Sequence, residues 1–161
     1  PTDINQLAAA IVAEATDGAE AERLARKLAE IDEEIAFVDA EKRRTELALQ
    51  LDWTETFGRP LAARQVVRHM FVEMNRVTEV ARSFIRGVAD EQITVLDAIY
   101  AKKTGVDCAA FVTDRAVQLL GGMGYVSDGE VERHYRDARI LGIGGGADEV
   151  MADLAARLLG L

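Results

Sequence analysis

Two glycine clusters are the features of this sequence whose residue types and spacing are best suited to chemistry. Residues 121–125 read Gly-Gly-Met-Gly-Tyr directly after an apolar run, and residues 144–146 are three glycines in a row. Glycine lets the backbone approach a ligand closely, and the accessible N–H groups suit phosphate oxygens or adenine edges. On spacing alone, a tight interhelical turn is the favoured interpretation of the first cluster, and a flexible loop that of the second. The alternative for 144–146 is an anion at a helix N-terminus.

The histidines and the cysteine are poorly placed for metal binding or nucleophilic catalysis. His69 lies in an amphipathic stretch and His134 in a charged one, and neither has a second His or a Cys at ligand spacing. Because a metal site needs converging ligands, we expect structural or surface roles for both and predict no metal. Cys108 has no histidine nearby in the sequence, so we expect a small buried apolar residue there.

The composition argues against nucleic-acid-binding, disulfide-rich and membrane-spanning proteins. The chain has 161 residues, 49% of them hydrophobic and 29% charged, which suffices for one substantial core. With 19 Lys and Arg against 28 Asp and Glu, the formal net charge is −9 and no basic stripe stands out, which disfavours nucleic acid as a partner. A single cysteine excludes a disulfide framework. We find no apolar run long enough to cross a bilayer and no leader peptide, and therefore expect a cytoplasmic protein.

Long helices must position these residues, because helix formers dominate and turn residues are sparse. Apolar residues recur every three or four positions from Val66 to Val88, which is the clearest amphipathic pattern of the chain. Within 19–54, an apolar seam shifts toward Leu47, Leu51 and Trp53, and the charges of 41–46 are typical of a solvated face. Long helices with short connections fold up and down against each other, which predicts an all-α bundle. The expected helices are 2–15, 19–54, 62–88, 91–120, 129–138 and 147–159, with a break at 57–60.

Two motifs resemble the C-terminal helical domain of the acyl-CoA dehydrogenases. Residues 116–140 read AVQLLGGMGYVSDGEVERHYRDARI, similar to that family's Gln-x-x-Gly-Gly-x-Gly-Tyr turn followed by an Arg-Asp-Ala-Lys/Arg-Ile helix end. Upstream, residues 57–61 read FGRPL and Gln65 follows, which is similar to the family's Phe-Gly-x-x-Leu and Gln element. The resemblance implies an up-and-down four-helix bundle over residues 19–161, preceded by an extra short helical segment over 1–18.

The resemblance also implies a function. Enzymes of this family oxidise the Cα–Cβ bond of an acyl-CoA thioester. In them a carboxylate removes the α-proton while FAD takes the β-hydride, and an electron-transferring flavoprotein then reoxidises the flavin. The bundle forms the core of an oligomer, and its turns reach the FAD of a neighbouring subunit. We therefore expect FAD as cofactor, with a homo- or hetero-oligomer, acyl-CoA and the electron-transferring flavoprotein as partners. A bundle without the family's other two domains is expected to be inactive.

The residues matching the family's cofactor contacts follow from the same resemblance. The resemblance places Thr56, Phe57 and Gln65 near the flavin or its diphosphate. It places Gln118, Gly121 and Gly122 on the adenosine side. Glu149, in the last helix, would lie near the same cofactor.

Departures from the family's pattern concern its arginine, its base and a threonine. Thr54 stands where the family has an arginine, which removes a charge-assisted bond worth about 1.5–3 kcal/mol. Gly145 stands at the usual position of the glutamate base, and Ala147 replaces a threonine. Some family members carry the base on the first helix of this domain, where an ungapped count reaches Leu28, with Glu22 and Glu30 nearby.

No catalytic residue is therefore predicted, and two alternatives stay open. One is a non-catalytic assembly subunit or degenerate paralogue that pairs with an active partner. The other is a helical interaction module whose long charged first helix binds a partner.

Overall fold

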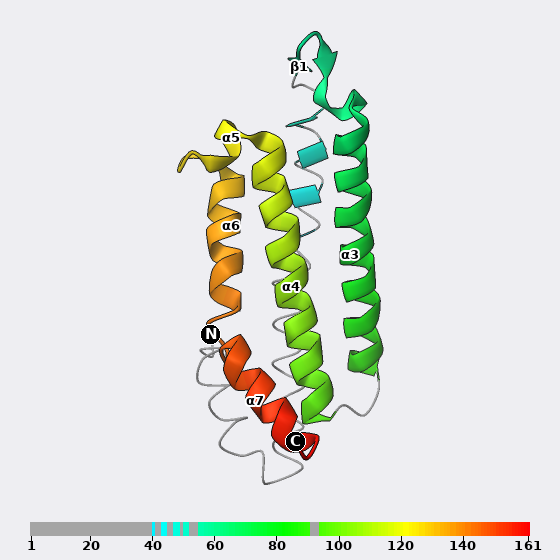
Figure 1. Ribbon diagram of the computed structural model, residues 1–161, viewed down its shortest axis with the longest axis vertical. Coiled ribbons are helices and arrows are strands. Elements are labelled where there is room, and N and C mark those ends of the chain that lie inside the picture. The colour runs from blue at the N-terminus through cyan, green and yellow to red at the C-terminus, as the bar shows by residue number, and fades with distance from the viewer. Residues whose placement is uncertain (1–39, 41–42, 45–46, 49, 52–54, 91–93) are drawn as a thin grey trace.

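The computed structural model describes residues 40, 43–44, 47–48, 50–51, 55–90 and 94–161, and these form an elongated helical bundle (Figure 1). The expected helix 2–15, the segment 1–18 and most of 19–54 lie outside the described residues. The elements in chain order are β1 (Glu55–Thr56), β2 (Arg59–Pro60), the 3-10 turn η1 (Leu61–Ala63), α3 (Gln65–Asp90), α4 (Val95–Leu120), α5 (Gly122–Tyr125), α6 (Glu130–Leu141) and α7 (Asp148–Leu158). The four helices expected beyond residue 60 are thus confirmed, with ends shifted by a few residues.

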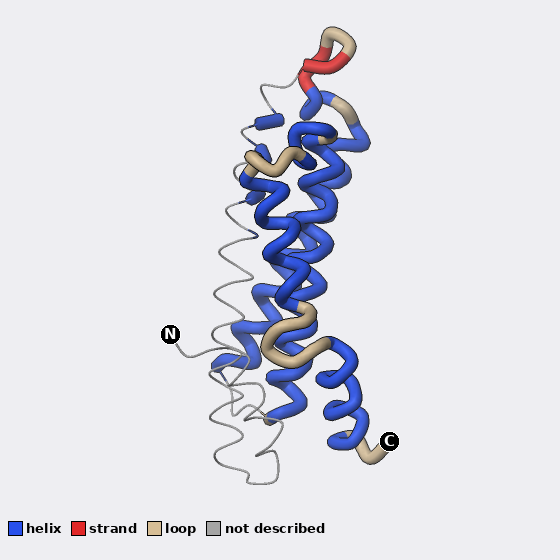
Figure 2. Tube along the Cα trace, turned by 90° about the vertical axis from the view of Figure 1, so that its left-hand side faces the viewer, coloured by secondary structure: helices blue, strands red, loops and turns tan. Residues whose placement is uncertain are grey.

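The helices α3, α4 and α6 run alternately down, up and down along the bundle, and α7 continues toward the end where α4 begins (Figures 1 and 2). Helix α4 starts with a capping box, in which the Thr94 hydroxyl accepts from the Asp97 N–H and the Asp97 carboxylate accepts from the Thr94 N–H. One apolar cluster joins the helices, and each fully buried Val, Leu or Met in it stabilises the fold by about 1.5–3 kcal/mol. Its buried members are Leu47, Leu51, Val67, Met74, Ala81, Cys108, Val112, Ala116, Leu119 and Val131.

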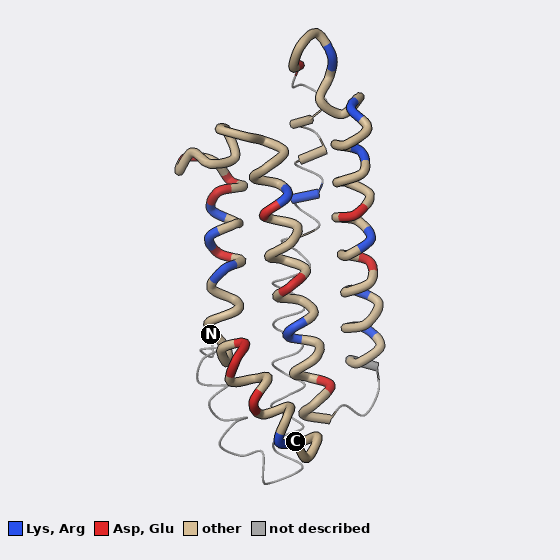
Figure 3. Tube along the Cα trace, in the orientation of Figure 1, with Lys and Arg blue, Asp and Glu red and all other residues tan. Residues whose placement is uncertain are grey.

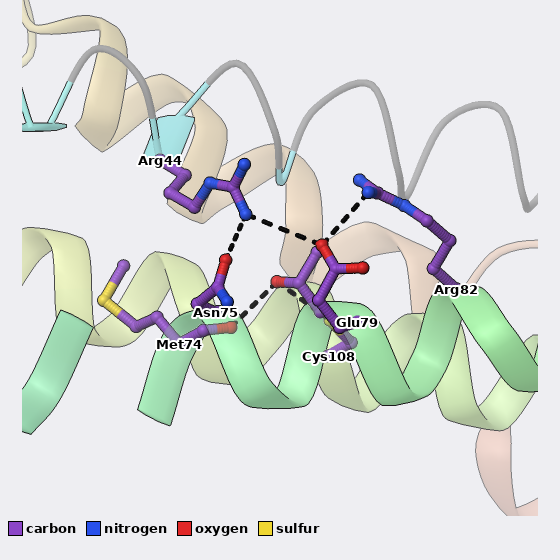
Figure 4. Close-up of polar contacts among 7 residues, drawn as sticks. Arg44, Met74, Asn75, Glu79, Arg82 and Cys108 are labelled. Carbon is purple, nitrogen blue, oxygen red and sulfur yellow. Dashed lines mark hydrogen bonds and ion pairs between the residues drawn. The ribbon is translucent and has the colours of Figure 1, made fainter. Parts of the chain in front are cut away.

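The charges of 41–46 were predicted to form a solvated face, and among the described residues Arg43 does not fit this prediction. Leu47 and Leu51 are buried as expected, and Trp53 lies outside the described residues, but Arg43 is only 1% exposed. Its neighbour Arg44 reaches across to α3, where its guanidinium donates to the Asn75 side-chain carbonyl and lies 3.6 Å from the Glu79 carboxylate (Figure 4). Arg44 therefore makes an inter-helix contact, in addition to any exposure to solvent.

The predicted break at 57–60 is a small hairpin. Strands β1 and β2 pair antiparallel, with Thr56 opposite Arg59, so the loop between them is Phe57-Gly58. Both loop residues have positive φ, 53° and 71°, as a two-residue hairpin with a type I′ turn requires. The hairpin projects from one end of the bundle and leads through η1 into α3 (Figure 1).

Glycines mark the remaining connections. Helix α4 ends at Gly121, whose φ of 57° turns the chain directly into α5, so the predicted tight interhelical turn is confirmed. Gly105 is buried inside the uninterrupted α4, which makes it a close-packing position. Within the described residues, no helix is both long enough and apolar enough to span a membrane.

Candidate cofactor-contacting site

The predicted cofactor residues separate into two groups in the structure. Thr56 and Phe57 lie on the hairpin, and Gln65 begins α3 beside it. Gln118 lies in the last turn of α4, and Gly121 and Gly122 connect it to α5, toward the same end of the bundle in both views (Figures 1 and 2). Glu149 lies in the first turn of α7, which occupies the opposite half of the molecule (Figure 1). One copy of the chain therefore brings six of these residues toward one end and leaves Glu149 apart.

The hairpin carries a hydroxyl group without a hydrogen-bond partner among the described residues and an aromatic ring exposed to solvent. The Arg64 Nη2 donates to the Thr56 carbonyl at 2.7 Å, and the Arg64 guanidinium carbon lies 5.7 Å from the centroid of the Phe57 ring. The Phe57 side chain is 99% exposed. The Thr56 hydroxyl is buried and has no hydrogen-bond partner within the described residues. An unsatisfied buried hydroxyl costs about 1–3 kcal/mol, which a ligand group at this point would relieve.

Gln65 and His69 lie on the surface, whereas His134 is buried. Gln65 is exposed, and its Nε2 lies 3.4 Å from the Nε2 of His69, which is exposed as well. His134 is 5% exposed in α6 and belongs to the interior. Among the described residues, no group of His, Cys, Asp and Glu side chains is arranged to hold a metal ion.

The first glycine cluster is partly packed and partly open. A Cβ on Gly124 would lie 2.9 Å from the Val117 carbonyl oxygen, so Gly124 lets α5 lie directly on the end of α4. At Gly121 and Gly122 an added Cβ would meet nothing within 4 Å, so their backbone is open to an approaching group. Next to them, Gln118 lines a groove of about 1180 Å³ between α4, α5 and α6. Its other lining residues include Tyr125, Tyr135, Arg136 and Ile140.

A buried lysine holds the second glycine cluster. Lys102 is 2% exposed, and its Nζ donates to the Leu141 carbonyl at 3.2 Å and to the Gly146 carbonyl at 2.9 Å. The turn between α6 and α7 is therefore a fixed structure, which corrects the expectation of a flexible loop. Asp148 and Glu149 occupy the first turn of α7, so this helix start already carries negative charge and does not suit an anion.

Lys102 was not among the predicted residues, although the sequence around it carries a signal. In α4 the residues one turn before and one turn after it, Ile99 and Val106, are both apolar and both buried. A lysine on such a face has to find buried acceptors, because an unpaired charge in the interior is strongly unfavourable.

Gly145, which the motif resemblance predicted to stand at the position of the base, is buried. Gly145 has a φ of 67° and Gly146 a φ of 101°, and a Cβ on Gly146 would lie 2.5 Å from the Met151 methyl carbon. The alternative base positions Glu22, Leu28 and Glu30 lie outside the described residues.

Cys108 is the small buried residue that was expected. It is 4% exposed, and its Sγ lies 3.9 Å from the Thr78 hydroxyl oxygen. Burial raises the pKa of the Cys108 thiol above its ordinary value. The thiol is therefore held in its protonated, unreactive form.

Comparison with known proteins decides the family. The family profile "Acyl-CoA dehydrogenase, C-terminal domain" matches residues 40–160. The chain belongs to this family. It is similar to human mitochondrial short-chain specific acyl-CoA dehydrogenase, 37% identical over 98 residues, which is 58% of this chain and 24% of the relative. It is equally similar to a 3-sulfinopropanoyl-CoA desulfinase of Variovorax paradoxus, 37% identical over 109 residues, covering 65% of this chain and 27% of the relative.

Solved structures agree with the fold. A putative acyl-CoA dehydrogenase from Mycobacterium smegmatis has a TM-score of 0.75 and 38% identity, covering 95% of this chain and 38% of that one. Butyryl-CoA dehydrogenase of Megasphaera elsdenii has a TM-score of 0.73 and 28% identity, covering 86% of this chain and 38% of that one. The chain spans only about a quarter of the length of the curated relatives, which include both dehydrogenases and a desulfinase.

Proposed function

We propose that this chain serves as the C-terminal helical domain of an acyl-CoA dehydrogenase-like flavoprotein, in which it supplies the oligomer core and part of the FAD site. The observation that carries the proposal is the hairpin end, with its unpartnered buried Thr56 hydroxyl and its exposed Phe57 ring. By family resemblance, the whole enzyme would dehydrogenate acyl-CoA thioesters in fatty-acid metabolism and pass electrons to an electron-transferring flavoprotein, in the cytoplasm.

The residues present have the chemistry that FAD requires. FAD would supply the acceptor for the substrate's β-hydride. Thr56 offers a hydroxyl donor, and Phe57 offers an apolar ring face to a flat aromatic system. The open backbone at Gly121 and Gly122 lets the adenosine side of the cofactor approach closely. Each group holds or orients the cofactor, and none of them transfers a proton.

An oligomer would explain why Glu149 lies apart from the other predicted residues. In a two-fold antiparallel pair, the α7 half of one copy lies beside the hairpin end of the other. Helix α3 also exposes Val80 and Phe84 one turn apart. These two side chains are apolar surface that an assembly could cover.

The test is the absorption spectrum of the intact gene product, purified natively with and without added FAD. We expect flavin bands at one FAD per chain. The Thr56→Val variant, which keeps the shape of the side chain but removes the donor, should hold FAD about tenfold less tightly. Thr104→Val, in the middle of α4, is the matched control and should bind FAD as the unmodified protein does. Absence of flavin even with FAD in excess would overturn the proposal.

One observation favours a second candidate, an assembly subunit that has lost the base. Gly145 is a buried glycine with a φ of 67°, where the family usually places a glutamate. Under this alternative, the gene product alone is inactive and binds flavin only with an active partner. Gly145→Glu is the discriminating variant. Activity that appears without any partner would show that the missing carboxylate was the only defect.

A further inference from the structure

The hairpin end is locally basic although the chain as a whole is acidic. The net charge is −9, yet residues 55–72, from the start of the hairpin into α3, contain Arg59, Arg64 and Arg68 against one acidic residue, Glu55. Figure 3 shows the Lys and Arg colour on the hairpin and on the first turns of α3. A local excess of positive charge attracts an anionic group to this end of the bundle.

Arg64 is the arginine among these three that is held against the predicted cofactor residues. Its Nη2 donates to the Thr56 carbonyl at 2.7 Å, and its guanidinium carbon lies 5.7 Å from the Phe57 ring centroid. Arg68 instead donates to the Ala63 carbonyl at 3.0 Å, at the start of its own helix. Arg59 is exposed on β2.

The Arg64 guanidinium retains donors for a ligand. A guanidinium carries five N–H donors in a fixed fork, which matches two phosphate oxygens at once. In the part of the chain that the structure describes, Arg64 uses one of these donors on Thr56 and forms no ion pair with an acidic residue. The contacts with Thr56 and Phe57 fix the side chain, so little conformational freedom is lost when a phosphate binds.

We propose that Arg64 supplies the positive charge toward the diphosphate of FAD that the chain lacks at Thr54. This inference rests on the proposed function. Arg64 follows Phe57 by seven residues, whereas the family's arginine precedes the phenylalanine by three, so sequence matching alone does not find it. The fold compensates, because β2 and η1 reverse the chain and return Arg64 to the backbone of Thr56.

The test measures binding of FAD and of riboflavin, which has no phosphate, to the intact gene product after its flavin has been removed. For Arg64→Ala we expect FAD affinity to fall about 10- to 100-fold while riboflavin affinity stays unchanged. Arg64→Lys should recover part of the loss, because it restores the charge without the fork. Arg59→Ala is the matched control, because it removes the same charge from the neighbouring hairpin without removing a contact to Thr56 or Phe57. It should lower FAD affinity much less than Arg64→Ala does. Equal losses for Arg64→Ala and Arg59→Ala, or an equal loss for both ligands, would refute the role of Arg64.

A second measurement separates this inference from the proposed function. If the gene product binds no flavin, the proposed function fails, and inorganic pyrophosphate is then titrated into the 161-residue chain by NMR. Shifts of the Gly58 amide and the Arg64 side-chain Nε–H that disappear in Arg64→Ala would uphold a diphosphate site without FAD. No shift at these groups would overturn the site as well.

Discussion

Replacing Lys102 tests whether one buried ammonium group holds the turn between α6 and α7. The Nζ of Lys102 donates to the carbonyls of Leu141 and Gly146, so it joins the end of α6 to a residue two positions before the start of α7. Methionine at this position would keep most of the apolar stem and remove both donors. The positive charge also lies at the C-terminal end of α6, where the helix dipole favours a cation.

The magnitude follows from the two carbonyl groups. Each carbonyl loses a charge-assisted bond and is left part-buried, at about 1–3 kcal/mol per group, while removal of a buried charge returns part of the loss. We expect a net decrease in the free energy of unfolding of about 2–3 kcal/mol. For a protein of this size the midpoint of thermal unfolding should fall by about 4–12 °C.

The neighbouring lysine is the control. The Lys103 side chain is 46% exposed and forms ion pairs with Asp107 and Asp148. Because exposed ion pairs contribute little, Lys103→Met should cost about 0.5 kcal/mol or less. Both variants are compared by thermal and urea unfolding, with amide hydrogen exchange at Gly142 to Asp148 as the local readout. Two results would refute this role of Lys102. One is a decrease in the free energy of unfolding for Lys102→Met no larger than that for Lys103→Met, and the other is unchanged amide exchange in the turn.

Three further predictions concern α4 and the residues around it. Gly124→Ala should lower the free energy of unfolding by about 1–3 kcal/mol, because its Cβ would lie 2.9 Å from the Val117 carbonyl oxygen. Gly122→Ala is the control and should cost less, because a Cβ there meets open space. Urea denaturation of the two variants measures the difference. Thr94 lowers the pKa of Asp97 below its ordinary value of 3.8, so the capping box stabilises the fold above that value and loses this contribution as the pH falls through the lowered pKa. Thr94→Ala should therefore lower the free energy of unfolding by about 1 kcal/mol near neutral pH and by less in strong acid. An equal decrease at both pH values, measured by urea unfolding, would contradict this. Cys108, whose pKa is raised by burial, should react with iodoacetamide far more slowly than the urea-unfolded chain at about pH 8, and equal rates would show the thiol to be accessible.

Residue patterns predicted the helices well because the information lies in local periodicity. The apolar repeat from Val66 to Val88 and the glycines at 121 and 122 are signals that a helix or its end requires. The hairpin was not predicted, because Phe57 adopts a positive φ that its residue type disfavours.

Contacts between distant parts of the chain are harder to predict from sequence. The ion pair of Arg44 with Glu79 and the hydrogen bond from Lys102 to Gly146 each join residues more than thirty positions apart, so only the fold brings them together. For Lys102, periodicity at least marked a buried face, whereas nothing in the local pattern marks Arg43 as buried. The candidate cofactor residues came from motif resemblance, whereas spacing alone favoured a tight turn at the first glycine cluster and a flexible loop at the second.

The most direct test of the central claim is a cryo-electron microscopy structure of the intact gene product with FAD. We predict flavin density in contact with Thr56, Phe57 and Arg64 of one copy and with the turn before α7 of another chain in the assembly. Density for FAD that contacts no hairpin residue, or an FAD-loaded protein whose hairpin projects into solvent, would contradict the account.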